Sequence, residues 1–265
     1  MSTAASNSPM QFVVRPSEDR GGDNHGWLKT FHTFSFAGYQ DPKWSSFGSL
    51  RVLNEDRVEP KTGFGTHSHR EFEIFSYLVS GELEHKDSMG NTEVLKRGDL
   101  QMTSAGTGIR HSEHSHGGKQ VHFLQIWSVP STRGLTPKYF TRHFTDQEKQ
   151  DKLVRIVAPI GAPGVTEARE AEGPAPVHSP LTLFATIISP SKSVVHTLGS
   201  KKVHIHVVQT SGYNTGKSSG ASIRLNGSTS ISEGDAVFGT GELGDKIEIE
   251  NTGDIPAEVL VFDLD

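Results

Sequence analysis

The sequence predicts an all-β protein made of two similar barrels in tandem, with few short helices. Its 28 glycines and 13 prolines are spread along 265 residues, which is typical of many short strands joined by turns. Short apolar runs recur between these turns, and a hydrophobic content of 33% is enough for two cores of ordinary size. The strand pattern of the first half also returns in the second half, which indicates an internal duplication.

Composition excludes several classes of function. The net charge is −5 and the sequence pI is about 6.3, without a basic face, so direct nucleic-acid binding is not expected. No run approaches the roughly 18 apolar residues of a membrane helix, and residues 1–9 lack the basic start and apolar core of a signal peptide. We therefore expect no membrane association, a disordered tail over residues 1–10, and an intracellular protein of the cytoplasm, the nucleus or both.

The first barrel is expected over residues 11–137. Its strands are predicted where apolar or alternating runs lie between turn residues, at 11–15, 49–54, 72–79, 82–87 and 122–127. A strand pair is expected within 23–36, and a further strand opens at 97–100. A Gly-rich bend at 104–108 resembles a phosphate cradle, but neither a Lys-Ser/Thr pair nor a helical pattern follows it. We therefore interpret the bend as a turn between strands.

A linker or long loop is expected over residues 138–180. This stretch is first polar and charged, with a short helix near 146–152, and then rich in Gly, Pro and Ala. The second barrel is expected over residues 181–265. When Gly212 is placed on Gly81, the apolar strands on either side of the two glycines also align, so the second half is a copy of the first.

Four potential metal ligands lie in two pairs within the first barrel. His67 and His69 are two residues apart, as are His111 and Glu113, so each pair shares one face of a strand. Two such strands side by side would direct four nitrogen and oxygen donors at one point. Because the chain has no cysteine, a metal must be held by imidazole and carboxylate groups. The spacing therefore predicts a metal site.

The second barrel is expected to lack this metal. When about five extra residues are placed in the loop 213–220 of the second half, its four corresponding positions are Leu198, Ser200, Ile247 and Ile249. The rival pair His204 and His206 is not followed by a second pair of donors, which favours a structural or surface role for both histidines.

Several strings of the sequence resemble the pirin family of the cupin superfamily. They are GFGTHSHR at 63–70, LEHKDSMGN at 83–91, AGTGIRHSE at 105–113, NHGW at 24–27 and HTFSFA at 32–37. The resemblance covers nearly the whole chain. Two departures are Ser68, where the family often has proline, and the loops at 161–176 and 213–220, which look long.

The resemblance implies a bicupin, with two double-stranded β-helix (jelly-roll) barrels, whose first barrel binds one metal. The family's ligands fall on His67, His69, His111 and Glu113. Fe(II) is the metal that the resemblance implies first, and the ligand set is also compatible with Mn, Ni, Cu or Zn. Four protein ligands in an octahedron would leave two positions for a substrate and O₂.

The activity that the resemblance implies is a quercetin 2,3-dioxygenase reaction, in which O₂ opens the ring of a flavonol. Glu113 is then a candidate base toward the substrate hydroxyl. His25, His32, Glu73 and Gln125 are candidates for orienting the ligands or lining the pocket. For each of these four residues a purely structural role is the alternative, and for His32 it is the favoured one.

A second function implied by the resemblance is an iron-binding, redox-sensing transcriptional coregulator that binds a transcription factor. A third alternative is a barrel that holds a metal without a present function. The expected partners are accordingly a small aromatic substrate and O₂ or, in the second case, a transcription factor. The chain is expected to be a monomer.

Overall fold

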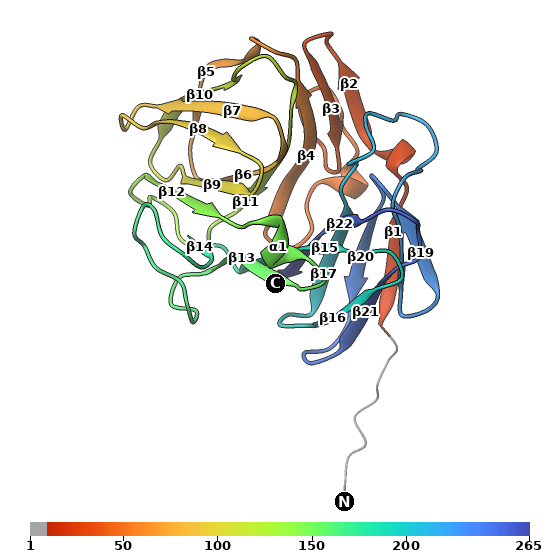
Figure 1. Cartoon of the computed structure of the whole chain (residues 1–265). Helices are drawn as coiled ribbons and strands as arrows, with labels where there is room; N and C mark the ends of the chain where they lie inside the picture. Colours follow the sequence, from red (N-terminus) through yellow and green to blue (C-terminus); the bar gives the residue numbers. More distant parts are fainter. Residues whose placement is uncertain (1–9) are drawn as a thin grey trace, which may run out of the picture.

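The computed structural model describes residues 10–265, and nearly all of their regular structure is β-strand (Figure 1). In the first unit, a seven-stranded antiparallel sheet faces a four-stranded one. The larger sheet has the order β12 (Lys138–His143), β9 (Asp99–Ser104), β6 (Glu73–Ser80), β11 (Val121–Ser128), β4 (Leu50–Val58), β3 (Leu28–His32) and β2 (Gly21–Asn24). The smaller sheet has the order β5 (Gly63–His69), β10 (Ile109–Ser115), β7 (Glu82–Asp87) and β8 (Thr92–Lys96).

The second unit repeats this arrangement, so the predicted pair of β-barrels is confirmed. Its larger sheet has the order β1 (Gln11–Arg15), β20 (Ala236–Thr240), β17 (Lys202–Val207), β22 (Ala257–Leu264), β15 (Leu181–Ile188), β13 (Val154–Pro159) and β14 (Ala175–Val177). Its smaller sheet has the order β16 (Ser193–Thr197), β21 (Lys246–Asn251), β18 (Ser222–Leu225) and β19 (Thr229–Ser232).

Helical structure within residues 10–265 is slight. It consists of α1 (Asp146–Lys149) and two 3₁₀ turns, Ser17–Asp19 and Pro42–Trp44. The helix α1 begins with a capping box. The Thr145 hydroxyl accepts a hydrogen bond from the backbone N–H of Glu148, and the Glu148 carboxylate accepts one from the backbone N–H of Thr145. No helix of the described part of the chain has the length and hydropathy that a bilayer crossing requires.

The boundaries of the two units differ from those expected from the sequence. Strand β1 was assigned to the first barrel, but it pairs antiparallel with β20 in the second unit. The stretch 138–180, expected as a linker, contributes β12 to the first unit and β13 and β14 to the second. Of these strands, β1, β12 and β14 form sheet edges, and pairing with a neighbouring strand satisfies their backbone groups. The expected tail falls outside the described residues except for Met10.

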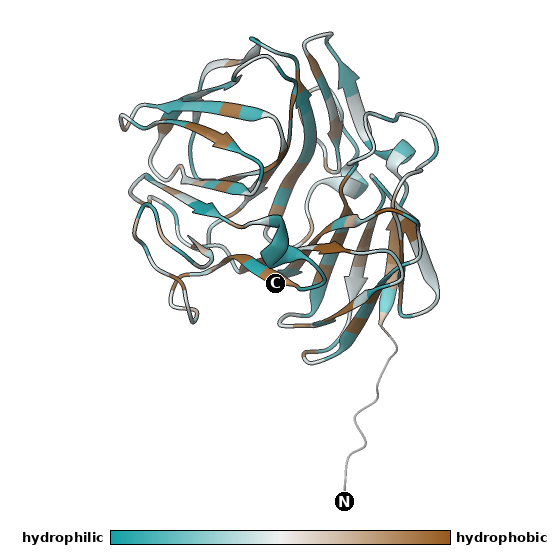
Figure 2. Ribbon diagram, in the orientation of Figure 1, coloured by the Kyte–Doolittle hydropathy of each residue, from teal (hydrophilic) through white to brown (hydrophobic). Residues whose placement is uncertain are grey.

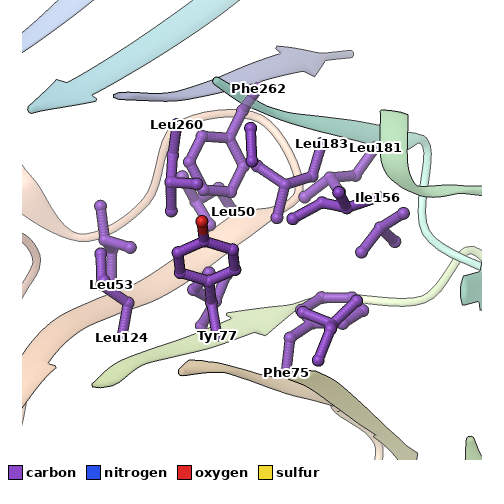
Figure 3. Close-up of a cluster of buried hydrophobic side chains, with 14 of the residues drawn as sticks. Leu50, Leu53, Phe75, Tyr77, Leu124, Ile156, Leu181, Leu183, Leu260 and Phe262 are labelled. Atoms are coloured by element: carbon purple, nitrogen blue, oxygen red, sulfur yellow. The ribbon is translucent and has the colours of Figure 1, made fainter. Parts of the chain in front are cut away.

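The two units pack together through the outer faces of their large sheets. Leu53, Phe75 and Leu124 come from the first sheet, while Leu183 and Phe262 come from the second, and all five are fully or almost fully buried (Figure 3). The strands carry the apolar residues of both units, whereas α1 is hydrophilic (Figure 2). Each large sheet therefore buries both of its faces, one in its own barrel and one against its neighbour.

The interiors of the two barrels differ in chemistry. The second barrel is filled with aliphatic side chains, including Val203, Ile223, Ile247 and Val259. In the first barrel, apolar filling is confined to one end, around Leu28, Val58, Leu78, Leu83, Leu95, Val121 and Phe123. The remainder of the first barrel is free to carry polar groups.

A buried ionic cluster crosses the boundary between the units. Glu55 on β4 accepts hydrogen bonds from Arg20 at 3.1 Å, His122 at 3.0 Å and His206 at 3.3 Å. Its other bond comes from the backbone N–H of Gln209, at 2.7 Å. Burial would raise the pKa of Glu55, but the hydrogen bonds from His122 and His206 and the charge of Arg20 hold it well below its usual range. His206, expected to have a structural role, thus ties the second unit to the first.

Replacing Glu55 with Gln should lower the free energy of unfolding by about 3–5 kcal/mol, because Arg20 would stay buried without a counter-charge. Glu172→Gln is the matched control, since Glu172 is exposed, and it should change the value by less than about 0.5 kcal/mol. Calorimetry of both variants measures the difference. Equal melting temperatures for Glu55→Gln and the wild type would contradict this account of the cluster.

Candidate metal centre

The four predicted ligands lie on two paired strands inside the first barrel. In the antiparallel pairing of β5 with β10, His67 lies directly opposite His111 and His69 opposite Ile109. The Nε2 atoms of His67 and His111 are 3.0 Å apart. The ring of His69 completes the group, at 4.7 Å from the His67 ring and 4.8 Å from the His111 ring. Ligand atoms of the three histidines all lie within 4.8 Å of one another.

A β-bulge in β5 sets the direction of these side chains. Between the pairs His67↔His111 and Phe64↔Glu113 the register shifts, so β5 carries one residue more than β10. Gly63 allows the two strands to approach here, because a Cβ at that position would collide with the backbone of Glu113 and His114. The bulge turns Phe64, His67 and His69 toward the barrel interior.

Burial keeps His69 and His111 neutral, and a hydrogen bond orients the ring of His67. The Nδ1 atom of His67 lies 2.8 Å from the carbonyl oxygen of Gly65, so Nδ1 carries the proton and Nε2 is free to bind a metal. Burial and the neighbouring imidazoles lower the pKa of His69 to about 4. Burial also lowers the pKa of His111 to about 4. Neutral imidazole is the form that coordinates metals.

Glu113 is buried and oriented by two amides. Gln125 donates to its Oε2 at 2.9 Å, and Gln101 donates to its Oε1. The Ser76 hydroxyl lies 3.3 Å from the same Oε1. Burial would raise the pKa of Glu113, but the attraction between its carboxylate and the imidazoles of His111, His85 and His67 when these are protonated, together with the Gln125 hydrogen bond, lowers it overall.

His85 joins this group, although the sequence analysis did not single it out as a site residue. It lies opposite Glu113 in the pairing of β7 with β10, and ligand atoms of His85, His111 and Glu113 lie within 4.8 Å of one another. Its Nε2 is 3.1 Å from Asp87, and its ring stacks on Tyr139 at 4.7 Å. The signal in the sequence was the His85-x-Asp87 spacing, which places both side chains on one face of a strand.

The four candidate supporting residues have different positions. Gln125 contacts Glu113, as predicted. His32 is buried and bonds Asn54 through Nδ1, whereas His25 is exposed and lies 3.2 Å from Asp23. Neither of these two histidines is brought into the ligand cluster.

Glu73 was predicted at the edge of the metal site or pocket, and the structure contradicts this. Its carboxylate accepts hydrogen bonds from the backbone N–H groups of His178 and Ser179, at 2.8 and 2.9 Å. On β6 the side chains alternate, and Ser76 faces the barrel interior, so Glu73 faces away from it. Glu73 therefore anchors the segment that leads into the second unit.

The structural repeat also corrects the predicted alignment of the two halves. His196 pairs with Ile247 just as His67 pairs with His111, so His196, and not Leu198, corresponds to His67. The pairing of β17 with β20 places Lys202 on Glu73, in step with His196 on His67, so the turn before β17 keeps its length. The alignment anchored on Gly81 and Gly212 was two residues off here because the segment after β17 is longer than its counterpart. His196 is buried and bonds Asp263 at 2.7 Å. One imidazole thus survives in the second barrel without the other ligands.

The residues of the first barrel fit a divalent metal. Two ligands bound at about 2.1 Å and at right angles are about 3 Å apart, and the Nε2 atoms of His67 and His111 show that separation, 3.0 Å. The Nδ1 atoms of His85 and His111 are buried without a hydrogen-bond partner within residues 10–265. An uncompensated imidazole nitrogen beside an ionised carboxylate suits coordination better than it suits a packed core.

Comparison with known proteins gives consistent results over the whole chain. The pirin family model matches residues 13–128. A quercetin 2,3-dioxygenase of Escherichia coli K12 is 38% identical over 254 residues, which cover 95% of this chain and 97% of that protein.

Among solved structures, YhhW from Escherichia coli has a TM-score of 0.81 at 35% identity, covering 96% of this chain and 98% of that one. The same bacterial pirin in complex with nickel(II) has a TM-score of 0.80, also at 35% identity, and covers 96% of this chain and 99% of that one. Together with the two-barrel fold and the motifs around His67 and His111, these similarities show that the chain belongs to the pirin family.

Proposed function

We propose that this protein is a metal-dependent dioxygenase that uses O₂ to open the ring of a flavonol such as quercetin. The observation that carries the proposal is a pair of adjoining ligand groups inside the first barrel, His67, His69 and His111 on one side and His85, His111 and Glu113 on the other, which share His111. Related proteins of this length are named quercetin 2,3-dioxygenase, which supports the substrate class.

The proposed ligands are His67, His69, His111 and Glu113, with His85 as a further nitrogen donor. In the structure His67 and His69 group with His111, and Glu113 groups with His85 and His111. A divalent metal in this set would act as a Lewis acid and as a redox partner for O₂. Iron(II) is the metal first expected, and nickel is supported by the nickel complex of the related YhhW. The coregulator alternative stays a prediction that no observation on the chain tests.

Glu113 is the candidate proton acceptor for the substrate hydroxyl. The carboxylate is ionised and fixed by Gln101 and Gln125, so it can accept a proton without first reorienting. The Tyr139 hydroxyl lies 3.1 Å from Gln101 and therefore helps to hold that amide. Trp127 and Phe72, whose rings are 5.3 Å apart, exclude water on the side of His69.

Metal content and oxygen uptake test the proposal directly. The purified protein, reconstituted without oxygen with Fe(II), Mn(II), Ni(II) or Cu(II), should hold about one metal per chain and consume O₂ when quercetin is added. His67→Ala should lose both properties. His114→Ala is the matched control, because His114 lies on β10 next to Glu113 but on the opposite face of the strand. Full metal content in His67→Ala would refute the ligand assignment.

A separate outcome concerns the reaction alone. Because Glu113 is also a proposed ligand, Glu113→Gln is compared with the wild type at equal metal content. It should retain the fold but lose oxygen uptake, since the amide cannot accept the proton. Stoichiometric metal in the wild type, with no uptake on quercetin for any of the four metals, would rule out the proposed activity and leave the metal site standing.

The two amides that hold Glu113 should matter for metal affinity as well. Gln125→Leu removes the donor to Oε2, and metal affinity should fall about 10- to 100-fold, as is usual when a ligand's hydrogen-bond partner is lost. Gln147→Leu, at an exposed position of α1, is the control. Competition with a chelator measures both dissociation constants, and unchanged affinity in Gln125→Leu would show that Glu113 needs no such support.

A further inference from the structure

A cavity of about 560 Å³ lies beside the metal centre, between β3 and the β5 edge of the smaller sheet. Its floor includes His32, Asn54 and Asp56, and Phe36 and Phe64 are among its walls. The ligand histidines do not line it. Asn54 pairs with Gln125 in the sheet, and Gln125 bonds Glu113, so the cavity adjoins the candidate metal centre through these two residues.

Two hydrogen-bond acceptors on the cavity floor lack a partner. Asp56 is 3% exposed, and its Oδ1 accepts the Thr30 hydroxyl, but its Oδ2 has no hydrogen bond within the described residues. His32 lies with Nδ1 2.9 Å from the Asn54 oxygen, so its Nδ1 carries the proton and its Nε2 presents a lone pair. Burial lowers the pKa of His32, which keeps the ring neutral. The floor of the cavity therefore presents hydrogen-bond acceptors that suit a ligand with hydrogen-bond donors.

The walls of the cavity are suited to a flat ring. Phe64 packs edge-on against Trp27 with ring centroids 5.3 Å apart, which fixes the ring in place. Phe36 lies 5.3 Å from His32 and 5.5 Å from Trp127, whose ring is in turn 4.8 Å from His69. A continuous series of aromatic side chains thus connects the cavity with the ligand histidines. Asp56 is two residues beyond Asn54, or roughly 7 Å along β4.

We propose that this cavity is a recognition subsite for hydroxyl groups on the ring of the substrate remote from the metal, with Asp56 and His32 accepting their hydrogen bonds. The inference rests on the proposed function, because it assumes that a flavonol binds at the metal by its 3-hydroxyl edge. Phenolic hydroxyls are donors, and Phe36 and Phe64 flank the ring that carries them. Asp56 and His32 select for hydroxylated flavonols, because a ring without hydroxyls would leave two buried acceptors unpaired.

The buried carboxyl of Asp56 should make the stability of the protein depend on pH. Burial raises the pKa of Asp56 to about 7, and the negative charges of Glu113 and Glu55 act in the same direction. The hydrogen bond from the Thr30 hydroxyl and the charge of Arg57 act in the opposite direction. Since the folded pKa is raised, the stability linked to this group is present below about pH 4 and is lost as the pH rises to about 7. The melting temperature of Asp56→Asn, relative to the wild type in the same metal state, should therefore increase between pH 4 and pH 7. A difference independent of pH would contradict the burial of an uncompensated carboxyl.

Binding of two compounds to the metal-loaded protein, under anaerobic conditions and above the pKa of Asp56, where its carboxylate is an acceptor, tests the subsite. Quercetin carries hydroxyls on both outer rings, whereas 3-hydroxyflavone keeps the metal-binding edge and has no other hydroxyl. The wild type should bind quercetin about 10- to 100-fold more tightly. Asp56→Asn replaces an acceptor by a donor and His32→Phe removes one, so each should lose about tenfold for quercetin and about twofold or less for 3-hydroxyflavone. Asp254→Asn, at an exposed loop position, is the matched control.

Oxygen uptake, measured separately on the same proteins, distinguishes the two proposals. Oxygen uptake on quercetin, with the wild-type preference preserved in Asp56→Asn and His32→Phe, would overturn the subsite and leave the dioxygenase. Binding that depends on Asp56 and the remote hydroxyls, without any uptake, would support the subsite and refute the activity. If neither compound binds the metal-loaded wild type, both proposals are wrong.

Discussion

The antiparallel pairing of β5 with β10 is the constraint on which the functional part of this protein depends. It places His67 opposite His111, and the bulge at Gly65 and Thr66 turns Phe64 inward opposite Glu113. A shift of one residue would direct all of these side chains to the outer face, because side chains alternate along a strand. Gly63 is part of the same constraint, since its missing side chain allows the two backbones to meet. The candidate metal centre is thus a consequence of strand register.

The two barrels show the same architecture with opposite interiors. In the second barrel, Ile247 and Ile249 take the places of His111 and Glu113, and aliphatic side chains fill the space between the sheets. In the polar interior of the first barrel, buried polar groups can find hydrogen-bond or ligand partners only in one another or in a bound metal. The second barrel buries apolar surface and supplies the outer sheet face on which the first barrel packs. The second barrel therefore contributes mainly to stability, and the first barrel carries the candidate metal ligands.

Strand β4 connects these two tasks. Glu55 points outward, where Arg20, His122 and His206 neutralise it at the boundary between the units. Asp56, the next residue, points inward to the cavity, where the charge of Arg57 only partly offsets its burial. The same carboxyl chemistry has opposite pKa directions at neighbouring positions, because the surroundings of each face decide which protonation state is stable. A paired carboxylate holds the fold together, and an unpaired one beside the metal centre is available to a ligand.

The sequence by itself determined the all-β class, the duplication and the pairs His67/His69 and His111/Glu113, because period-two spacing and turn residues are local properties of the chain. It also identified Gln125 correctly as a neighbour of Glu113. Only the tertiary structure decided that β1 belongs to the second unit, that Glu73 faces away from the site, and that His85 and Asp56 face into the first barrel. It also paired His196, not Leu198, with the counterpart of His111. These outcomes depend on which strand lies beside which, and in which register, and a contact between residues far apart in the chain leaves no local pattern in the sequence.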